Sequence, residues 1–430
     1  DLRLYTDIKG IDRKDLPVDA SVAFPVPANI FYEGEDKPLA SIVVGSWLGE
    51  ELKLEAKAKV ISADGTEKGI PTLSFTYLDT AKKEFELPLA APGGYKLSVE
   101  LGGLPEPVKF THRYVIVRRP PALTDTQKDM SPYALNIHSG TPVDYSGRIA
   151  RLGFVWVRDY AFNYEWMVRA RGEGSYAGWP WYPKIMDGIN SAGLKVLPCL
   201  MKAMTCKPKM DEPDDEWRRN IAHIICSFPK INCWELDNEY FMPGTDFTEM
   251  FGGKRYGSYH KAFADISKAV APRNWSVAEG AAHIPNTTDR IQIKNGYFAN
   301  IDILNGHRYC GYSAPEISKE NANTGQADTV RSLLRDVYMD WDDAAHSDGK
   351  DRQTWITEWG WDTKAGQPVS EWEQAAYIQR GYMLGFACGI DKMFWYWYDD
   401  SPTASYFFDG CGIFDVKPTL EPKPVAASFA

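Results

Sequence analysis

The sequence lacks several features that would assign its class directly. It contains no apolar run as long as a membrane span, and it does not open on a positively charged segment followed by an apolar one. The spaced metal motifs Cys-x-x-Cys, His-x-His and His-Glu-x-x-His are absent from it as well. We therefore expect no membrane span and no metal site of a common type. Because the chain begins at Asp1, we also expect a secreted or periplasmic protein whose signal peptide has been removed.

Cysteine is scarce, and all seven cysteines lie beyond residue 198. Cys199, Cys233 and Cys388 fall in apolar runs, where a free thiol behaves as a small buried hydrophobic group. The other four leave room for a disulfide. An odd number of cysteines without regular spacing does not, however, form the disulfide framework of a small secreted domain.

Positive charge is also in short supply. Lys and Arg number 48 against 58 Asp and Glu, which gives a net charge of −10. This balance argues against a nucleic-acid partner. Aromatic residues are frequent, at 13% with 15 Trp and 23 Tyr, and they serve either large cores or the stacking of flat rings on sugar faces. The length of 430 residues suits two domains, or one barrel with an added module.

Residues 1–118 have the pattern of an all-β domain. Short runs, several of them alternating between apolar and polar residues, are separated by turn sequences such as ADG, APGG and LGGLPEP. The run LKLEAKAKV alternates over a full strand, which places one face in water. This spacing predicts a small antiparallel β-sandwich of immunoglobulin-like size, whose default role is to brace its neighbour. Residues 119–132 are Pro-rich and are predicted to form a linker.

From residue 133 to residue 415 the pattern changes to strand, loop and helix in repetition. We count eight strand candidates, with helix-like stretches between most of them. They are YALNIHS, FVWVRDY, KVLPCLM, NCWELDN, WSVAEGA, IDILNGH, TWITEWG and KMFWYWY. This alternation predicts an α/β fold: a (β/α)8 TIM barrel at 133–415, preceded by the sandwich and followed by a tail at 416–430. A doubly wound sheet is the competitor, but no Gly-rich phosphate-binding turn follows the first strand.

The fourth strand candidate ends in Asp237, Asn238 and Glu239, three polar side chains that are costly to bury unless they are paired or in use. The seventh ends in Glu358. In an eight-stranded barrel these two strands stand across the mouth from each other, so the two Glu side chains can converge over one bond of a substrate. Glycosidic cleavage needs such a pair, with one carboxyl protonated and the other ionised. Glu235 and Asp237 share the parity of Glu239 and are rivals for the acid, but Glu239 lies nearest the strand end.

The stretches ELDNEYF and WITEWGW together resemble the clan A glycoside hydrolases, the retaining TIM-barrel glycosidases, without resolving the family within the clan. The resemblance covers roughly residues 130–415. It implies that Glu239 is the acid/base, that Glu358 is the nucleophile, and that Asn238 hydrogen-bonds the sugar 2-hydroxyl. It also implies a carbohydrate substrate, no cofactor, and a bond that is β in D-sugars or α in L-arabinosides.

Other residues match the clan more loosely. Arg158 resembles the strand-2 Arg whose charge keeps the nucleophile ionised, and pairing with Asp159 or a loop acid is the alternative. His307 and Tyr309, in HRY, resemble a strand-6 pair in which the Tyr donates to the nucleophile and the His orients a hydroxyl, although a structural His fits as well. Trp397 resembles the strand-8 Trp that forms a sugar platform, and a core position fits its sequence equally.

The remaining candidates rest on position alone. His138 follows the first strand, where it either lines the floor of a sugar subsite or caps the strand. Trp179 and Trp181, in the loop GWPWYP, form either a stacking wall for sugars or a contact under the barrel rim. Trp361 follows the strand-7 Glu closely, and we place it with the substrate-binding residues.

Lys202 and Arg308 are also expected to face the mouth. If both reach the cleft, an anionic sugar, a uronate or a sulfated one, becomes a hypothesis.

Two other functions stay open at this point. A carbohydrate-binding barrel without catalysis would keep the aromatic residues but lose a carboxylate, and both carboxylates are present. A metal-dependent hydrolase on the same fold would need ligands scattered over the barrel. We therefore expect a glycosidase that cleaves an oligo- or polysaccharide with retention, by a two-Glu double displacement. The sequence determines neither the sugar, nor endo or exo action, nor the oligomeric state.

Overall fold

The computed structural model describes residues 18–46, 51–77, 80–88, 91–104, 107–137, 145–172, 182–205, 210–240, 253–316, 334–366, 368–417 and 419–429. The chain divides into two compact units. The first is built from both ends of the sequence, Asp1–Pro120 and Ile413–Ala430, and the second is Pro121–Gly412. The chain thus passes between the units twice, and the segment expected as a separate tail groups with the N-terminal unit.

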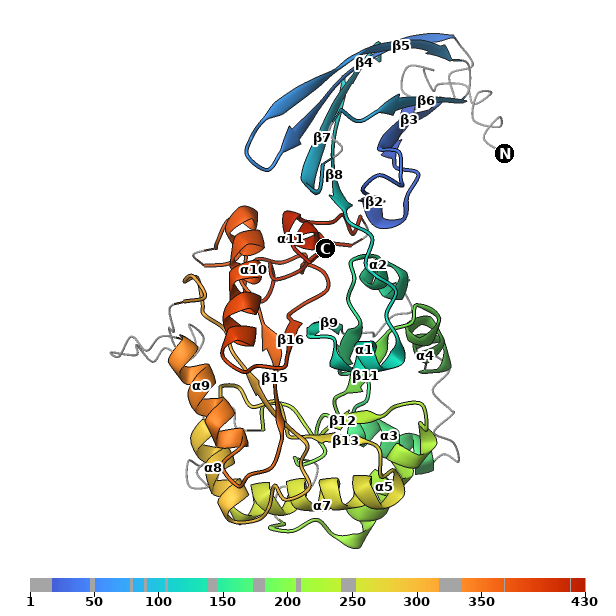
Figure 1. Cartoon of the computed structure of the whole chain (residues 1–430). Helices are drawn as coiled ribbons and strands as arrows, with labels where there is room; N and C mark the ends of the chain where they lie inside the picture. The colour runs from blue at the N-terminus through green and yellow to red at the C-terminus, as the bar shows by residue number, and fades with distance from the viewer. Residues whose placement is uncertain are drawn as a thin grey trace. The chain divides into compact units, whose positions relative to one another are not determined.

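The second unit holds one sheet of eight parallel strands (Figure 1). The strands are β9 (Tyr133–Ile137), β10 (Trp156–Asp159), β11 (Lys195–Pro198), β12 (Cys233–Glu235), β13 (Trp275–Val277), β14 (Ile303–His307), β15 (Gln353–Trp359) and β16 (Lys392–Trp395). Their order is β11-β10-β9-β16-β15-β14-β13-β12. A parallel bridge between Cys199 and Glu235 joins the two edges, and the Leu200 N–H donates to the Glu235 carbonyl at 3.0 Å. The sheet is therefore a nearly closed TIM barrel, and the eight expected strands are confirmed.

Helices follow most of the strands and lie around the outside of the barrel (Figure 1). They are α2 (Tyr145–Arg151), α3 (Tyr164–Gly172), α4 (Tyr182–Ser191), α5 (Asp215–Ser227), α7 (Lys254–Val270), α8 (Asn286–Lys294), α9 (Leu334–Ala345) and α10 (Glu371–Ala387). Helix α10 starts at a capping box, in which Ser370 and Glu373 each accept the other's backbone N–H. Asp214 caps α5 by accepting the Trp217 N–H at 2.8 Å. These caps set where the two helices begin.

Apolar rings fill the amino-terminal end of the barrel interior. Trp156, Trp275 and Trp355 meet there, with ring centroids between 5.6 and 6.5 Å apart. The ammonium of Lys392 lies 4.8 Å from the centre of one of these rings and 4.9 Å from another. It also donates to the backbone carbonyls of Asp129 and Ser131. Lys392 is only 1% exposed, and the cation–π and carbonyl contacts offset the cost of burying its ammonium group.

A short helix, α1 (Asp125–Met130), lies within the segment expected to be a linker. Thr124 and Gln127 form its capping box. Its Lys128 carbonyl accepts the Trp156 indole N–H at 2.8 Å. The segment therefore packs on the amino-terminal end of the barrel, and the cap sequence TDTQ was the overlooked signal for it.

Six cysteines lie in the described ranges, and all six are free thiols. Cys199, Cys233 and Cys388 are buried, as predicted. The disulfide for which the sequence leaves room does not form among these six.

The first unit contains two β-sheets. One has the order β1-β3-β6 and the other β2-β8-β7-β4-β5. Their elements are β1 (Val18–Ala23), η3 (Pro27–Asn29), β2 (Ile30–Tyr32), β3 (Leu39–Ser46), β4 (Leu52–Ser62), β5 (Glu67–Tyr77), β6 (Thr80–Glu86), β7 (Gly93–Gly102) and β8 (Val108–Val117). All pairs are antiparallel except β2 with β8, which is parallel.

One hydrophobic cluster takes side chains from both of these sheets. It includes Ile42 and Val44 of β3 together with Leu97 and Val99 of β7. Along β4 the buried residues alternate with exposed ones, as the run LKLEAKAKV predicts. The two sheets thus share a core.

The C-terminal segment completes this unit. It carries α11 (Pro424–Ala427), and Pro424 lies so close to Gly94 that a Cβ on the glycine would be 3.0 Å from the proline Cα. Glu421 accepts from the ring of His112 at 2.5 Å and from the Arg113 N–H at 2.9 Å. The segment is therefore anchored on β7 and β8.

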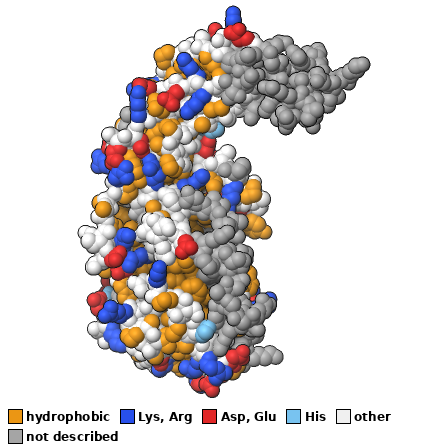
Figure 2. Space-filling model, turned by 90° about the vertical axis from the view of Figure 1, so that its right-hand side faces the viewer, with side chains coloured by type: hydrophobic (Ala, Val, Ile, Leu, Met, Phe, Trp, Pro, Cys, Tyr) orange, Lys and Arg blue, Asp and Glu red, His pale blue; other side chains and the backbone are white. Residues whose placement is uncertain are grey.

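No helix in the described part of the chain is long and apolar enough to cross a membrane. On the face drawn in Figure 2, Lys, Arg, Asp and Glu side chains are interspersed with apolar ones over the described surface.

We expect Glu421→Ala to lower the free energy of unfolding by about 1–3 kcal/mol, because it leaves partly buried donors of β8 without their acceptor. Denaturation in urea, followed by circular dichroism, measures the change. Glu67→Ala is the matched control. Glu67 pairs with Lys59 at 2.8 Å on the surface of the same unit, where loss of the pair should cost about 0.5 kcal/mol or less. Equal effects of the two changes would contradict the anchoring role.

Candidate active site

Glu358 lies at the carboxyl-terminal end of β15 and is surrounded by hydrogen-bond donors. The Arg158 guanidinium donates to its Oε1 at 2.8 Å, and the Tyr160 hydroxyl contacts the same oxygen. The Tyr309 hydroxyl donates to Oε2 at 2.9 Å. Burial raises the pKa of both tyrosines well above the usual value, so that both hydroxyls stay protonated and can donate.

The protonation state of Glu358 follows from this shell. Burial alone would raise the pKa of the Glu358 carboxyl. His307 and Arg158, together with the hydrogen bonds from Tyr160 and Tyr309, outweigh burial and hold the pKa below its usual value of 4.5. The side chain is therefore an ionised carboxylate in a buried position, as a nucleophile requires.

Glu239 reaches the same space from the other side of the mouth. Its Oε1 lies 2.9 Å from Nδ1 of His307, and that nitrogen is 3.6 Å from Oε2 of Glu358. Carboxylate oxygens of the two Glu residues lie within 4.8 Å of each other. The Glu239 side chain is 25% exposed, whereas that of Glu358 is 7% exposed. The two carboxyls thus share one site in different surroundings.

The backbone between Glu235 and Glu239 is not a strand. β12 ends at Glu235, and both Asp237 and Glu239 have positive φ, of 64° and 46°. The alternation that placed Glu235, Asp237 and Glu239 on one side therefore does not apply. Two left-handed residues turn the chain so that Glu239 faces the mouth.

Neither rival for the acid is placed to serve. Glu235 is fully buried and forms a two-pronged ion pair with Arg158, at 2.6 and 2.7 Å. Asp237 is 3% exposed and accepts the backbone N–H groups of Lys202, Met204 and Asn238 at 2.7–2.9 Å. Burial raises the pKa of Asp237 to about 6. Glu235 and Asp237 therefore stabilise the surroundings of the site, through Arg158 and through backbone N–H groups, and do not face the mouth.

Arg158 is the centre of the network. Besides Glu235 and Glu358, it donates to Oδ1 of Asn238 at 2.6 Å and to Oδ1 of Asn136 at 3.1 Å. It therefore pairs with acids across the barrel rather than with its neighbour Asp159. Since Oδ1 of Asn238 is occupied, its Nδ2 is directed away from Arg158, where it can donate to a sugar hydroxyl.

The strand-6 and strand-8 candidates lie beside these groups. His307 contacts Glu239, and Tyr309 donates to Glu358, as described above. Trp397 is half-buried and stacks on Tyr396, with ring centroids 5.6 Å apart and planes at 13°. Tyr396 in turn meets Tyr309 edge to face at 6.2 Å. The aromatic side of the site is thus continuous with the donors around Glu358.

The structure does not place Trp361 in the site. Its ring is 1% exposed, and its indole N–H donates to the Ser313 carbonyl at 2.8 Å. It packs against Trp359 and Trp395 in the core, so the assignment to substrate binding is wrong.

The structure gives the two cations expected at the mouth different surroundings. The Lys202 side chain is 52% exposed and lies 3.4 Å from Glu165. Arg308 is 7% exposed, and its backbone N–H donates to the Glu358 carbonyl at 2.9 Å. These positions do not support the anionic-sugar hypothesis. His138, Trp179 and Trp181 lie outside the described residues.

Sequence reasoning missed Tyr160, the Glu235–Arg158 pair and Asn305, which donates to Glu235 at 2.8 Å. Two of these had a signal. Tyr160 follows Arg158 by two positions, and Asn305 precedes His307 by two. Because side chains alternate along a strand, each is expected on the same side as a predicted residue. The pairing of Glu235 with Arg158 had none, because the two are 77 positions apart.

Glu239, His307 and Glu358 are also close enough to hold a cation, because one ligand atom from each lies within 4.8 Å of the others. Both oxygens of Glu358 already accept from protein donors, one of them the positively charged Arg158. A cation would compete with that guanidinium. The arrangement therefore suits an unmetallated carboxylate pair better than a metal centre.

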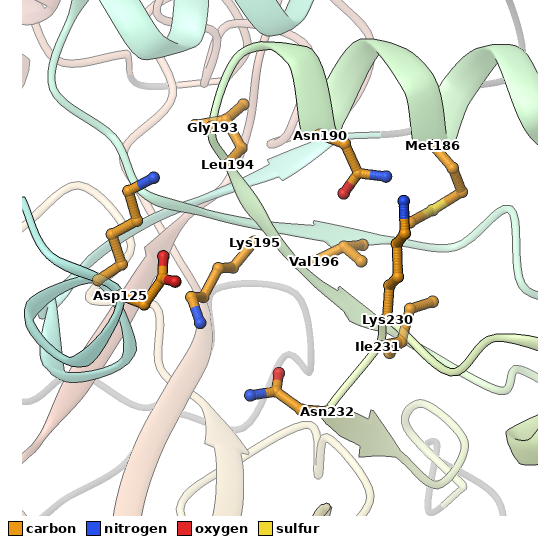
Figure 3. Close-up of a pocket in the computed structure, with 11 residues that line it drawn as sticks. Asp125, Met186, Asn190, Gly193, Leu194, Lys195, Val196, Lys230, Ile231 and Asn232 are labelled. Atoms are coloured by element: carbon orange, nitrogen blue, oxygen red, sulfur yellow. The ribbon is translucent and has the colours of Figure 1, made fainter.

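A pocket of about 320 Å³ lies at the opposite, amino-terminal end of the strands (Figure 3). Lys195, which opens β11, and Asn232, which precedes β12, line it together with Asn190 of α4. The Lys195 ammonium pairs with Asp129. Because catalytic groups of such barrels gather at the carboxyl-terminal ends of the strands, this pocket is not the candidate active site.

No protein-family model matches the sequence, and no curated protein matches it. Solved structures do match the fold. One is a family 39 glycoside hydrolase from the gut symbiont Bacteroides cellulosilyticus WH2, with a TM-score of 0.71 at 20% identity over 94% of this chain and 81% of that chain. Another is the GH39 enzyme from Xanthomonas axonopodis pv. citri, with a TM-score of 0.50 at 16% identity over 73% of this chain and 67% of that chain. At the level of fold, the chain is similar to glycoside hydrolases, as its resemblance to clan A predicts.

Proposed function

We propose that the chain is a glycoside hydrolase that cleaves an oligo- or polysaccharide with retention. The observation that carries this proposal is the Glu239–Glu358 pair, whose carboxylate oxygens lie within 4.8 Å of each other in different surroundings. Retaining glycosidases hold their carboxyls about 5–5.5 Å apart, and inverting ones about 6.5–9.5 Å. The fold shared with solved glycoside hydrolases supports the same reaction class.

In the first step, Glu358 attacks the anomeric carbon while Glu239 gives its proton to the glycosidic oxygen. The bond from that carbon to the leaving group breaks, and an ester bond to Glu358 forms. Oε1 of Glu358 accepts from both Arg158 and Tyr160, whereas Oε2 accepts from Tyr309 and faces His307. We therefore assign the attack to Oε2.

In the second step, Glu239 is ionised and takes a proton from a water molecule. That water attacks the anomeric carbon, the ester bond breaks, and both carboxyls regain their first protonation states. His307 Nδ1, 2.9 Å from Glu239, can donate to the ionised form between the steps. Asn238 Nδ2 is free of Arg158 and would bind the sugar 2-hydroxyl throughout.

We expect Glu358→Ala to abolish turnover, because it loses the nucleophile, and Glu239→Ala to slow cleavage of poor leaving groups by about 10²–10⁴-fold, because it loses the acid/base. A panel of aryl β-glycosides and α-L-arabinosides, followed by polysaccharides, measures this and identifies the sugar.

Azide should restore activity to both variants on activated substrates, and the product configuration, read by proton NMR, should be opposite in the two. Activity that survived Glu358→Ala would contradict the double-displacement mechanism. A wild type that binds sugars but cleaves none of them would favour the binding-barrel alternative.

The acid limb of the pH profile of kcat/KM should lie below pH 4.5, because the donors around Glu358 hold its pKa below that value. Tyr309→Phe removes a donor to the ionised form, so the pKa rises and the limb moves to higher pH. Tyr312→Phe is the control, because that hydroxyl donates to the Ala365 carbonyl at 3.3 Å instead. A limb that stayed in place in Tyr309→Phe would remove Tyr309 from the nucleophile's shell.

A metal-dependent hydrolase is the second candidate, since Glu239, His307 and Glu358 could serve as ligands. The Arg158 guanidinium beside Glu358 argues against it. We expect exhaustive dialysis against EDTA to leave kcat unchanged. A loss that zinc or manganese restored would favour the metal enzyme over the glycosidase.

Two further proposals concern the whole chain. We propose that the N-terminal unit is an immunoglobulin-like sandwich that braces the barrel, and that the protein is secreted or periplasmic. Activity of the barrel expressed without the N-terminal unit tests the first, and fractionation of the producing cells tests the second.

A further inference from the structure

The residues that follow β13 hold the turn that carries Glu239. The Glu239 N–H donates to the Gly280 carbonyl at 2.8 Å, and Asn238 and Gly280 form a parallel bridge. One residue further on, the Tyr240 N–H donates to Oε2 of Glu279 at 3.0 Å. Two successive N–H groups are thus held by two successive residues.

This support acts where the backbone needs it. Glu239 has a φ of 46°, a conformation that residues other than Gly and Asn adopt rarely. Such a conformation persists only when its surroundings impose it. The acceptor on Glu279 holds the peptide that leaves Glu239, and therefore limits the direction in which the Glu239 side chain can point.

Glu279 is itself firmly placed. It is fully buried, and its own N–H donates to Nε2 of His260 at 3.0 Å. Nδ1 of that His lies 2.8 Å from the Tyr256 carbonyl, and burial lowers the His260 pKa to about 4, so the ring is neutral with its proton on Nδ1. Burial raises the pKa of the Glu279 carboxyl well above its usual value, and Asp237, Glu239 and Glu235 add to the effect. These surroundings favour the neutral form of Glu279, whose Oε2 accepts the Tyr240 N–H.

The glycine beside it lies against the catalytic network. A Cβ at Gly280 would come within 2.6 Å of Nε2 of His307, 2.8 Å of Oε1 of Glu235 and 3.0 Å of the Arg158 guanidinium. The segment Glu279–Gly280 therefore packs directly on the groups that surround both carboxyls. A movement of this segment would be felt at Glu239.

We propose that Glu279 is a positioning residue for the acid/base. Through its hydrogen bond to the Tyr240 N–H, it fixes the turn that directs the Glu239 carboxyl toward His307 and the leaving-group oxygen. Glu279 touches no reacting atom in this role. The inference rests on the proposed function, since it assigns Glu239 the transfer of a proton.

The test compares Glu279→Ala with Glu279→Gln on two substrates of the sugar that the wild type cleaves. The phenyl glycoside needs a proton on its leaving oxygen, and the 2,4-dinitrophenyl glycoside does not. In Glu279→Ala we expect kcat/KM, which reports the first step alone, to fall about 10- to 100-fold on the phenyl glycoside and much less on the dinitrophenyl glycoside. Glu279→Gln keeps an oxygen that can accept the Tyr240 N–H on a side chain of the same length, and it should stay close to the wild type on both.

The control is Asp289→Asn. Asp289, on α8, is another buried carboxyl and accepts from the Trp341 indole N–H at 2.8 Å. Its substitution should affect the two substrates equally. If Glu279→Ala does not fold, Glu279→Asp, which withdraws the acceptor by one methylene, takes its place with the same expected separation. Equal losses on both substrates, or a Gln variant as impaired as the Ala variant, would overturn the proposal.

Failure of the proposed function gives a different result in the same assay. Glu239→Ala should itself separate the two substrates. A Glu239→Ala variant that treated both substrates alike would show that Glu239 is not the acid, whatever the Glu279 variants do.

Discussion

The buried charge of Arg158 is the constraint on which the site depends. A guanidinium with no exposed surface is tolerated only where counter-charges and acceptors surround it. Burial opposes its charge, and Glu235 most strongly restores it, so that the pKa of Arg158 stays well above its usual value. Glu235 and Glu358 share this one cation.

That sharing has a chemical consequence. Glu235 accepts hydrogen bonds from two guanidinium nitrogens of Arg158, at 2.6 and 2.7 Å, and Glu358 accepts one from the third nitrogen at 2.8 Å. A carboxylate that bound Arg158 alone would feel more of its positive charge, and its pKa would be lower still. The fully buried Glu235 thus takes up part of the Arg158 charge beside Glu358. The tyrosines add donors to Glu358 without adding charge.

Asp237, Asn238 and Glu239, the polar residues that follow β12, each have a different set of partners. Asp237 accepts three backbone N–H groups and fixes the loop after β11. Asn238 is oriented by Arg158, which donates to its Oδ1. Asp237 is buried, Asn238 and Glu239 are partly exposed, and Glu239 faces the mouth. The cost of placing three polar groups together is offset because each has partners, and the left-handed turns separate their directions.

The high aromatic content serves the core first. Among the largest fully buried side chains are Trp156, Trp217, Trp234, Trp341, Trp355, Trp361 and Trp395. Trp361 belongs with them, since its indole N–H is satisfied by a backbone carbonyl inside the protein. Within the described residues, the rings of Tyr396, Phe407 and Phe408 contact Tyr309 beside Glu358, and Trp397 stacks on Tyr396. Composition alone could not separate these two uses of the same residue type.

The sequence by itself determined the barrel and its carboxylate pair. Strand periodicity is a local property of the sequence, and an eightfold repetition of strand and helix fits few topologies. The ends of β12 and β15 could therefore be placed on opposite sides of one barrel mouth. Tertiary structure alone decided the pairing of Arg158 with Glu235, the grouping of Ile413–Ala430 with the N-terminal unit, and the hold of Glu279 on the turn at Glu239. These contacts join residues that no local pattern relates, because hydrogen bonds and ion pairs depend on which groups the folded chain brings together in space.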